Sequence, residues 1–274
     1  MNKGYYIVGM PSSGKTTFLA ALGYLLDMDT DMDWKLIQCN NREYLMEVSA
    51  RWASCKQMEH TPIDTEGVIE LILADKGGNE YYIKLIDRAG EFFKRRRRPI
   101  ERDTEIQDGI RGNTVLFFLN FTNLKREPLE GVLPEELRDT KLSEDTKEYK
   151  EIYKKMIGAF DLSVQADHVA LLQTMLDSKE KQINISLVVS AWDIFEGSGM
   201  PPEDVIKDRA PLFWQMLQSH LDVLNLTYWG LSAQGGDWSE ETELEKIMDT
   251  DILKRIKLVD DKGKVFSDIT LLLS

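Results

Sequence analysis

Short apolar runs, rich in β-branched and aromatic residues, recur along the chain between longer stretches of helical pattern. One of them, residues 115–119, is apolar at every position, as expected of a central strand covered on both faces. This alternation predicts an α/β protein whose mostly parallel central sheet carries helices on both faces. The predicted strands are residues 4–9, 67–74, 81–87, 114–120, 184–190 and 226–231.

Two further patterns refine this sheet. Residues 75–79 read Asp-Lys-Gly-Gly-Asn, a turn-rich link that predicts a β-hairpin and so one antiparallel strand at the edge of the sheet. Apolar stripes at helical spacing predict packing helices at residues 18–26, 149–157 and 213–221, and Pro211 suits the first turn of the last one. The stripes are interpreted as core packing.

No Pro/Gly-rich linker divides the chain, so residues 1–274 are predicted to form a single domain. Residues 121–142 are polar and contain proline, and a helix-like run follows, so an insertion is expected near residues 121–180. A C-terminal extension is expected from about residue 236, with an acidic helix near residues 239–248 and a hairpin through residues 260–263.

Composition excludes several classes of protein. No apolar run approaches the roughly 20 residues that span a bilayer, and the N-terminus lacks a signal-peptide layout, so a cytoplasmic protein without a transmembrane segment is expected. A net charge of −13 argues against nucleic-acid binding. Cys39 and Cys55 form no C-x-x-C pair, so neither a zinc site nor a disulfide is expected. The oligomeric state stays open.

Residues 9–16 match the phosphate-loop signature G-x-x-x-x-G-K-[ST] at every position, between a predicted strand and a predicted helix. Backbone N–H groups of such a loop, together with the helix N-terminus, hold phosphate oxygens. Lys15 is predicted to reach the β- and γ-phosphates, and the Thr16 hydroxyl to ligate Mg²⁺. The predicted phosphate-binding residues are Gly9, Pro11, Ser12, Ser13, Gly14, Lys15, Thr16 and Thr17.

Residues 87–91 (Asp-Arg-Ala-Gly-Glu) close the third predicted strand and resemble the D-x-x-G switch motif of Ras-like GTPases. The resemblance implies that Asp87 holds Mg²⁺ through water and that the Gly90 N–H meets the γ-phosphate. GTPases of this class also place a threonine upstream to complete the Mg²⁺ shell. Thr65 is preferred because it adjoins the next predicted strand, and Thr61 remains an alternative.

Glu91 stands where Ras-like enzymes often have a glutamine that positions water. A carboxylate can orient or deprotonate water, but it also repels the γ-phosphate, so hydrolysis is expected to be slow or dependent on a partner. The predicted catalytic residues are Lys15, Thr65 and Glu91. Five consecutive cations follow at residues 94–98; they are either a solvated segment or a patch that faces a partner or a phosphate.

Residues 190–193 read Ser-Ala-Trp-Asp at the end of the fifth predicted strand, where GTPases carry N-K-x-D or T-K-x-D. The resemblance implies that Asp193 accepts hydrogen bonds from guanine N1 and N2. Ala191 departs from the pattern, because it lacks the lysine stem that covers the base, and this weakens the case for guanine over adenine. As an alternative, Asp193 caps the next helix.

The sixth predicted strand ends on Ser232, Ala233 and Gln234, which resemble the S-A-K loop whose backbone contacts the guanine oxygen. Together the motifs at residues 4–234 resemble the Ras-like branch of translation-factor-related GTPases. The Ser-x-Trp-Asp variant and the Asp-Ile-Thr tail at residues 268–270 are also similar to the bacterial double-GTPases of conflict systems.

These resemblances imply a P-loop NTPase fold and a protein that binds and hydrolyses GTP with Mg²⁺. They further imply a nucleotide-dependent switch whose two switch regions act on a protein partner. Two alternatives stay open. One is a P-loop ATPase or small-molecule kinase, and the other is a nucleotide-binding module without turnover.

Overall fold

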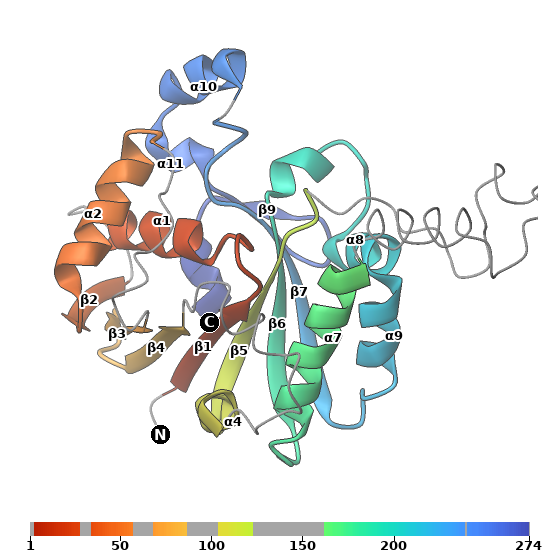
Figure 1. Cartoon of the computed structure of the whole chain (residues 1–274). Coiled ribbons are helices and arrows are strands. Elements are labelled where there is room, and N and C mark those ends of the chain that lie inside the picture. Colours follow the sequence, from red (N-terminus) through yellow and green to blue (C-terminus); the bar gives the residue numbers. More distant parts are fainter. Residues whose placement is uncertain are drawn as a thin grey trace, which may run out of the picture.

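The computed structural model describes residues 3–27, 34–56, 68–86, 104–122, 162–238 and 240–273. Their strands are β1 (Lys3–Gly9), β2 (Trp34–Cys39), β3 (Val68–Asp75), β4 (Glu80–Ile86), β5 (Asn113–Leu119), β6 (Ile183–Ser190), β7 (Leu224–Ser232), β8 (Lys257–Val259) and β9 (Val265–Phe266). These strands form one sheet in the order β2-β3-β4-β1-β5-β6-β7-β8-β9 (Figure 1).

Helices connect and cover these strands. The helices are α1 (Lys15–Asp27), α2 (Arg42–Ala53), α4 (Thr104–Ile110), α7 (Leu162–Leu176), α8 (Pro202–Arg209), α9 (Pro211–Gln218), α10 (Glu241–Met248) and α11 (Ile252–Arg255). Two 3₁₀ turns, η2 (Trp192–Phe195) and η3 (Ile269–Leu273), complete the described elements.

The centre of the sheet is parallel, as predicted, because β4, β1, β5, β6 and β7 all pair in parallel. The hairpin predicted at residues 75–79 is confirmed: β3 runs antiparallel to β4, and the Gly78 N–H donates to the Asp75 carbonyl at 2.9 Å. Residues 67 and 87, predicted as strand ends, lie outside the described residues.

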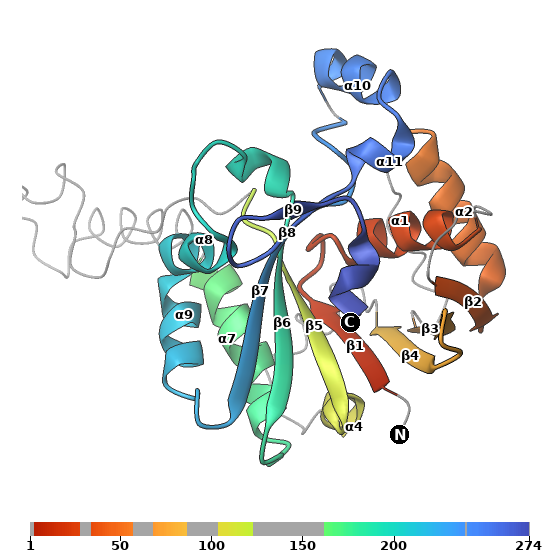
Figure 2. The same ribbon diagram turned by 180° about the vertical axis from the view of Figure 1, so that it is seen from behind.

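The margins of the sheet differ from the prediction of one antiparallel edge strand. β3 is not at the edge, since β2 pairs antiparallel on its outer side. At the opposite margin β8 is antiparallel to β7, and β9 is antiparallel to β8, so the sheet continues beyond β7 (Figure 2). The sequence pattern misses β2 because none of its side chains is buried, and the strand contains no long continuous apolar run.

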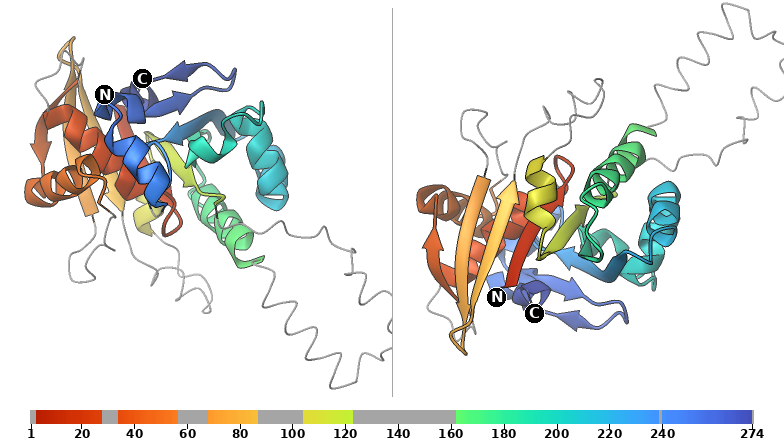
Figure 3. Two further views of the ribbon diagram at one scale, coloured as in Figure 1. Left: turned by 90° about the horizontal axis from the view of Figure 1, so that it is seen from above. Right: turned by 90° about the horizontal axis from the view of Figure 1, so that it is seen from below.

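Two apolar layers lie on opposite faces of the sheet, so the predicted placement of helices on both faces is confirmed (Figure 3). Alternate residues of one strand enter different layers, as the pleat requires. In β5, Phe118 lies in the layer that contains α1 and α2, whereas Phe117 lies in the other layer, against rings of α7 and α9. Both phenylalanines are fully buried.

The predicted helices agree in part. α1 buries its apolar stripe, and α9 begins at Pro211 as predicted. α9 ends at Gln218, however, and the next bond is of the i→i−3 type, from the His220 N–H to the Leu217 carbonyl at 3.1 Å. Leu221, predicted to lie in this stripe, is therefore beyond the helix and 51% exposed. The helix predicted at residues 149–157 lies outside the described part of the chain.

The segment expected as an insertion contributes α7, which is the crossover helix between β5 and β6 and packs in the second apolar layer. The rest of that segment, residues 123–161, lies outside the described residues. The acidic helix of the C-terminal extension is α10, and the hairpin predicted at residues 260–263 joins β8 to β9. The single-domain organisation stays a prediction. No described helix is long and apolar enough to cross a membrane.

Candidate nucleotide-binding site

The predicted site residues follow neighbouring parallel strands. β1, β5, β6 and β7 lie side by side and point the same way, so the loops after them meet at one edge of the sheet. Ligands of open α/β sheets bind at the carboxyl ends of such strands. The structure therefore brings the phosphate loop, the residues after Ser190 and the residues after Ser232 to the same edge.

The phosphate loop packs tightly against β5 and β6. A Cβ atom at Gly9 would lie 2.6 Å from the Phe118 carbonyl oxygen, and one at Gly14 would lie 2.8 Å from the Cβ of Ser190. Gly14 also has φ +92°, a conformation that other residues rarely adopt. Both glycines of the signature are thus required by geometry, and the fold is that of a P-loop NTPase.

Lys15 begins α1 and turns its ammonium back over the loop. Its Nζ donates to the carbonyl oxygens of Gly9 and Met10 at 3.1 and 3.0 Å, and the residue is only 5% exposed. A buried cation needs such partners. Thr16 and Thr17 follow in the first, partly exposed turn of α1, where the helix dipole favours a bound anion.

One observation tests whether this loop fits a phosphate group. The Ser13 hydroxyl is buried, and among the described residues it has no hydrogen-bond partner. A buried polar atom of this kind calls for an explanation such as a ligand or an ion. The loop therefore fits an anionic ligand, and Thr16, predicted to ligate Mg²⁺, follows Lys15 directly in the first turn of α1.

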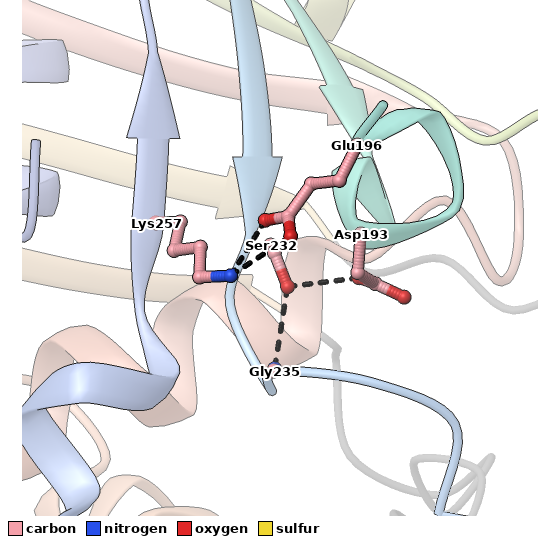
Figure 4. Close-up of polar contacts among 5 residues, drawn as sticks. All are labelled: Asp193, Glu196, Ser232, Gly235 and Lys257. Atoms are coloured by element: carbon pink, nitrogen blue, oxygen red, sulfur yellow. Dashed lines mark hydrogen bonds and ion pairs between the residues drawn. The ribbon is translucent and has the colours of Figure 1, made fainter. Parts of the chain in front are cut away.

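Asp193 lies in η2, directly after β6, and is held from the neighbouring strand. The Ser232 hydroxyl donates to Asp193 Oδ1 at 2.8 Å and accepts from the Gly235 N–H at 3.3 Å (Figure 4). The alternative that Asp193 caps a helix is wrong, because the N-cap of η2 is Ala191. Ala191 has φ +50°, a conformation costly for alanine and common at functional sites.

The other base-loop residues are also fixed by hydrogen bonds. The Ser190 hydroxyl donates to the Leu119 carbonyl at 3.1 Å. The Ala233 carbonyl accepts from Trp52 Nε1 at 2.9 Å, and Gln234 Nε2 donates to the Gly236 carbonyl at 2.8 Å. The loop after β7 is thus held both from within and by α2.

Sequence reasoning missed three side chains around this site. Asn120 donates from Nδ2 to the Ser12 carbonyl at 2.9 Å, and Trp52 bonds the loop after β7. Lys257 lies opposite Ser232 in the β7–β8 pair and binds Glu196 at 2.7 Å (Figure 4). That ion pair is half exposed and contributes under about 1 kcal/mol. Of the three, only Asn120 could have been predicted from the sequence, because it is the polar residue that ends an apolar strand at this edge of the sheet.

The predicted switch residues lie outside the described part of the chain. They are Thr61, Thr65, Asp87, Gly90, Glu91 and residues 94–98. Their roles as Mg²⁺ ligands, γ-phosphate contacts or catalytic groups stay predictions.

Solved structures of three GTP-binding proteins or domains are similar to this chain. The nucleolar GTP-binding protein 1 structure from Plasmodium falciparum is 12% identical, with 90% of this chain and 87% of that chain covered and a TM-score of 0.37. The ADP-ribosylation-factor-like SAR1 GTPase of Encephalitozoon cuniculi, in complex with GDP, is 11% identical (82% and 67% covered, TM-score 0.35). The GDP form of the T. maritima FeoB cytosolic domain is 16% identical (91% and 63% covered, TM-score 0.31).

A search of curated proteins found no match. The family model described as Double-GTPase 1 matches residues 6–274, which confirms the resemblance drawn from the motifs and supports GTP binding. With this match over nearly the whole chain, the protein belongs to the Double-GTPase 1 family.

Proposed function

We propose that this protein binds GTP with Mg²⁺ at the carboxyl edge of its sheet, hydrolyses it, and acts as a nucleotide-dependent switch toward a protein partner. The observation that carries the proposal is the Ser232–Asp193 hydrogen bond, which holds a carboxylate at the sheet edge that also carries a complete phosphate loop. A base-reading group and a phosphate-binding group on one sheet edge are what a nucleotide requires.

At the phosphate end, Lys15 and the N-terminus of α1 bind the negative charge of the β- and γ-phosphates. The Ser13 hydroxyl gains the hydrogen-bond partner that it lacks in the described structure. Thr16, Asp87 and either Thr65 or Thr61 would hold Mg²⁺. When bound, the ion neutralises phosphate charge and orients the γ-phosphoryl group for transfer.

At the base end, Asp193 distinguishes guanine from adenine. Ser232 donates to one carboxylate oxygen and fixes the plane of the group, so the carboxylate can accept from guanine N1–H and N2–H. Adenine has an acceptor at N1, which the carboxylate repels. The alanine at position 191 leaves one face of the base without a lysine stem, so we expect the affinity to depend strongly on Asp193.

Hydrolysis and switching rest on residues outside the described part of the chain. Glu91 would position the attacking water, and its charge near the γ-phosphate favours slow turnover unless a partner assists. Residues 94–98 offer cations to a partner or to the phosphates. The switch regions would change their order with the γ-phosphate and so present different surfaces to the partner.

The first prediction concerns the base. Asp193→Asn should weaken GTP binding by about tenfold or more, about 1.4 kcal/mol, because an amide replaces one acceptor oxygen with a donor. The same change should improve relative binding of xanthosine triphosphate, which has a carbonyl at C2 in place of the amino group. Displacement of a fluorescent nucleotide measures both affinities.

Two variants control this experiment. Lys15→Ala should lose binding of every nucleoside triphosphate, since the phosphates lose their main cation. Asp222→Asn makes the same chemical change at an exposed turn before β7 and should bind like the wild type. ATP displacing GTP from the wild type would favour the ATPase or kinase alternative. If a single-turnover assay shows no hydrolysis of bound GTP, either alone or with candidate partners, the result would favour a nucleotide-binding module without turnover.

A further inference from the structure

The phosphate loop contains a turn in an unfavourable conformation. Pro11 and Ser12 are its central residues, and the Ser13 N–H donates to the Met10 carbonyl at 3.1 Å. Ser12 has φ +60°. Proline at the second position and positive φ at the third are features of a type II turn, which normally places glycine at the third position. A serine keeps this conformation only where its surroundings hold it there.

Asn120, which follows the end of β5, stabilises this turn by a hydrogen bond. Its Nδ2 donates to the Ser12 carbonyl at 2.9 Å. Its Oδ1 accepts from both the backbone N–H and the hydroxyl of Thr122, at 2.9 and 2.8 Å. Because two donors occupy the oxygen end of the amide, the NH₂ end is directed at Ser12.

The neighbouring strand ends do not offer the same contact. Ser190, at the end of β6, uses its hydroxyl on the Leu119 carbonyl, and Ala191 has no polar side chain. Among the described side chains at the ends of β5 and β6, the one hydrogen-bonded to the phosphate loop is therefore Asn120.

This hydrogen bond orients the peptide group between Ser12 and Ser13. In a trans peptide the carbonyl and the following N–H point in opposite directions. Holding the Ser12 carbonyl toward Asn120 therefore keeps the Ser13 N–H directed at the Met10 carbonyl, and this bond closes the turn. A loop whose turn is already closed binds a phosphate without the cost of ordering the loop at the moment of binding.

We propose that Asn120 is a positioning residue of the phosphate loop, which keeps the Ser12 turn in its phosphate-binding form. The inference rests on the proposed nucleotide site but not on the identity of the base. Asn120→Ala should release GTP and GDP about tenfold faster, which corresponds to about 1.4 kcal/mol. The ratio of GTP to ATP affinity should stay unchanged, because the loop contacts only phosphates.

Stopped-flow release of fluorescent GTP and GDP from the full chain tests the proposal. Asn120→Asp should release nucleotide faster still, because a carboxylate cannot donate to the Ser12 carbonyl and adds negative charge near the phosphates. Thr122→Ala removes one of the two donors to Asn120 Oδ1 at an exposed site and should accelerate release by a smaller factor. Thermal melting without nucleotide establishes that each variant is folded.

Asn113→Ala is the matched control. Asn113 lies at the opposite end of the same strand, and its Nδ2 also donates to a backbone carbonyl, that of Gly109, at 2.7 Å. This variant should release nucleotide at the wild-type rate. Equal acceleration by Asn113→Ala, a shift in the GTP-to-ATP ratio in Asn120→Ala, or unchanged release in both Asn120 variants would overturn the inference alone. Failure of the wild type to bind any nucleoside triphosphate would instead overturn the proposed function and this inference together.

Discussion

A buried histidine makes the stability of this protein depend on pH. His168 is 1% exposed, and its ring lies 6.1 and 5.6 Å from the rings of Phe117 and Phe213. Among the described residues neither ring nitrogen has a hydrogen-bond partner. Burial lowers the pKa of His168 from 6.5 to about 4, so the folded protein holds it neutral.

The unfolded chain binds a proton at this histidine near pH 6.5, whereas the folded chain does so only near pH 4. Between these values the unfolded state binds more protons, so stability is full above pH 6.5 and falls as the pH drops. We expect a loss of about 3 kcal/mol from this residue by pH 4. Urea unfolding at several pH values measures the slope.

His168→Leu should flatten this slope by the same amount relative to the wild type. His220→Gln is the control, since His220 is only partly buried and hydrogen-bonds to the Met216 carbonyl. Parallel slopes in His168→Leu and the wild type would show that another group titrates in this window.

At the residue scale, the sequence predicted those site residues that belong to a motif of fixed spacing. The phosphate loop imposes fixed positions on Gly14 and Lys15, so a pattern search finds them. Trp52 and Lys257 reach the base loop through tertiary contacts with strands or helices far away in sequence. No spacing along the chain encodes such contacts.

Among the elements, α2 is joined to the base loop by one buried hydrogen bond. Trp52 of α2 is fully buried, packs its ring 5.4 Å from that of Tyr24, and donates to the Ala233 carbonyl. Trp52→Phe removes the indole N–H, so the Ala233 carbonyl loses this hydrogen bond. We expect the free energy of unfolding to fall by about 1–3 kcal/mol, and GTP affinity to fall with it because the base loop shifts.

Trp214→Phe makes the matched change in α9, on the other face of the sheet, where Trp214 packs against Tyr228. This variant should lose stability but keep its GTP affinity. Urea unfolding and nucleotide displacement on both variants separate the two effects. Equal GTP affinity in both variants would show that Trp52 supports only the core.

Strands could be predicted from the sequence where burial on both faces requires a run of apolar residues. β5 and β6 are covered on both faces, and each contains a short apolar run, residues 115–119 and 187–189, so the sequence located them. β2 is an edge strand with half-exposed side chains, and its pairing with β3 is irregular near Leu36 and Gln38. The position of β2 in the sheet depends on pairing with β3, which is distant in sequence, and the local pattern of apolar residues does not reveal that pairing.

At the scale of the whole molecule, the C-terminal extension completes both the sheet and a core layer. β8 pairs with β7, and η3 places Ile269, Leu272 and Leu273 in the apolar layer that also contains α1. Each of these three side chains is at most 3% exposed. Full burial of one such side chain contributes about 1.5–3 kcal/mol, so the three together approach the net stability of a typical domain, about 5–15 kcal/mol.

A chain that ends at residue 256 should therefore fail to fold or melt far below the wild type, followed by circular dichroism. Leu273→Ala tests the same contact with less disruption and should cost about 2–5 kcal/mol of unfolding free energy. Met248→Ala is the control, because Met248 is 59% exposed and contributes little to the core. Near- and far-ultraviolet signals of the wild type should change together, as expected of the single domain predicted for residues 1–274. A truncated chain that melts like the wild type would show that the extension is a separate unit and would contradict the single domain predicted for residues 1–274.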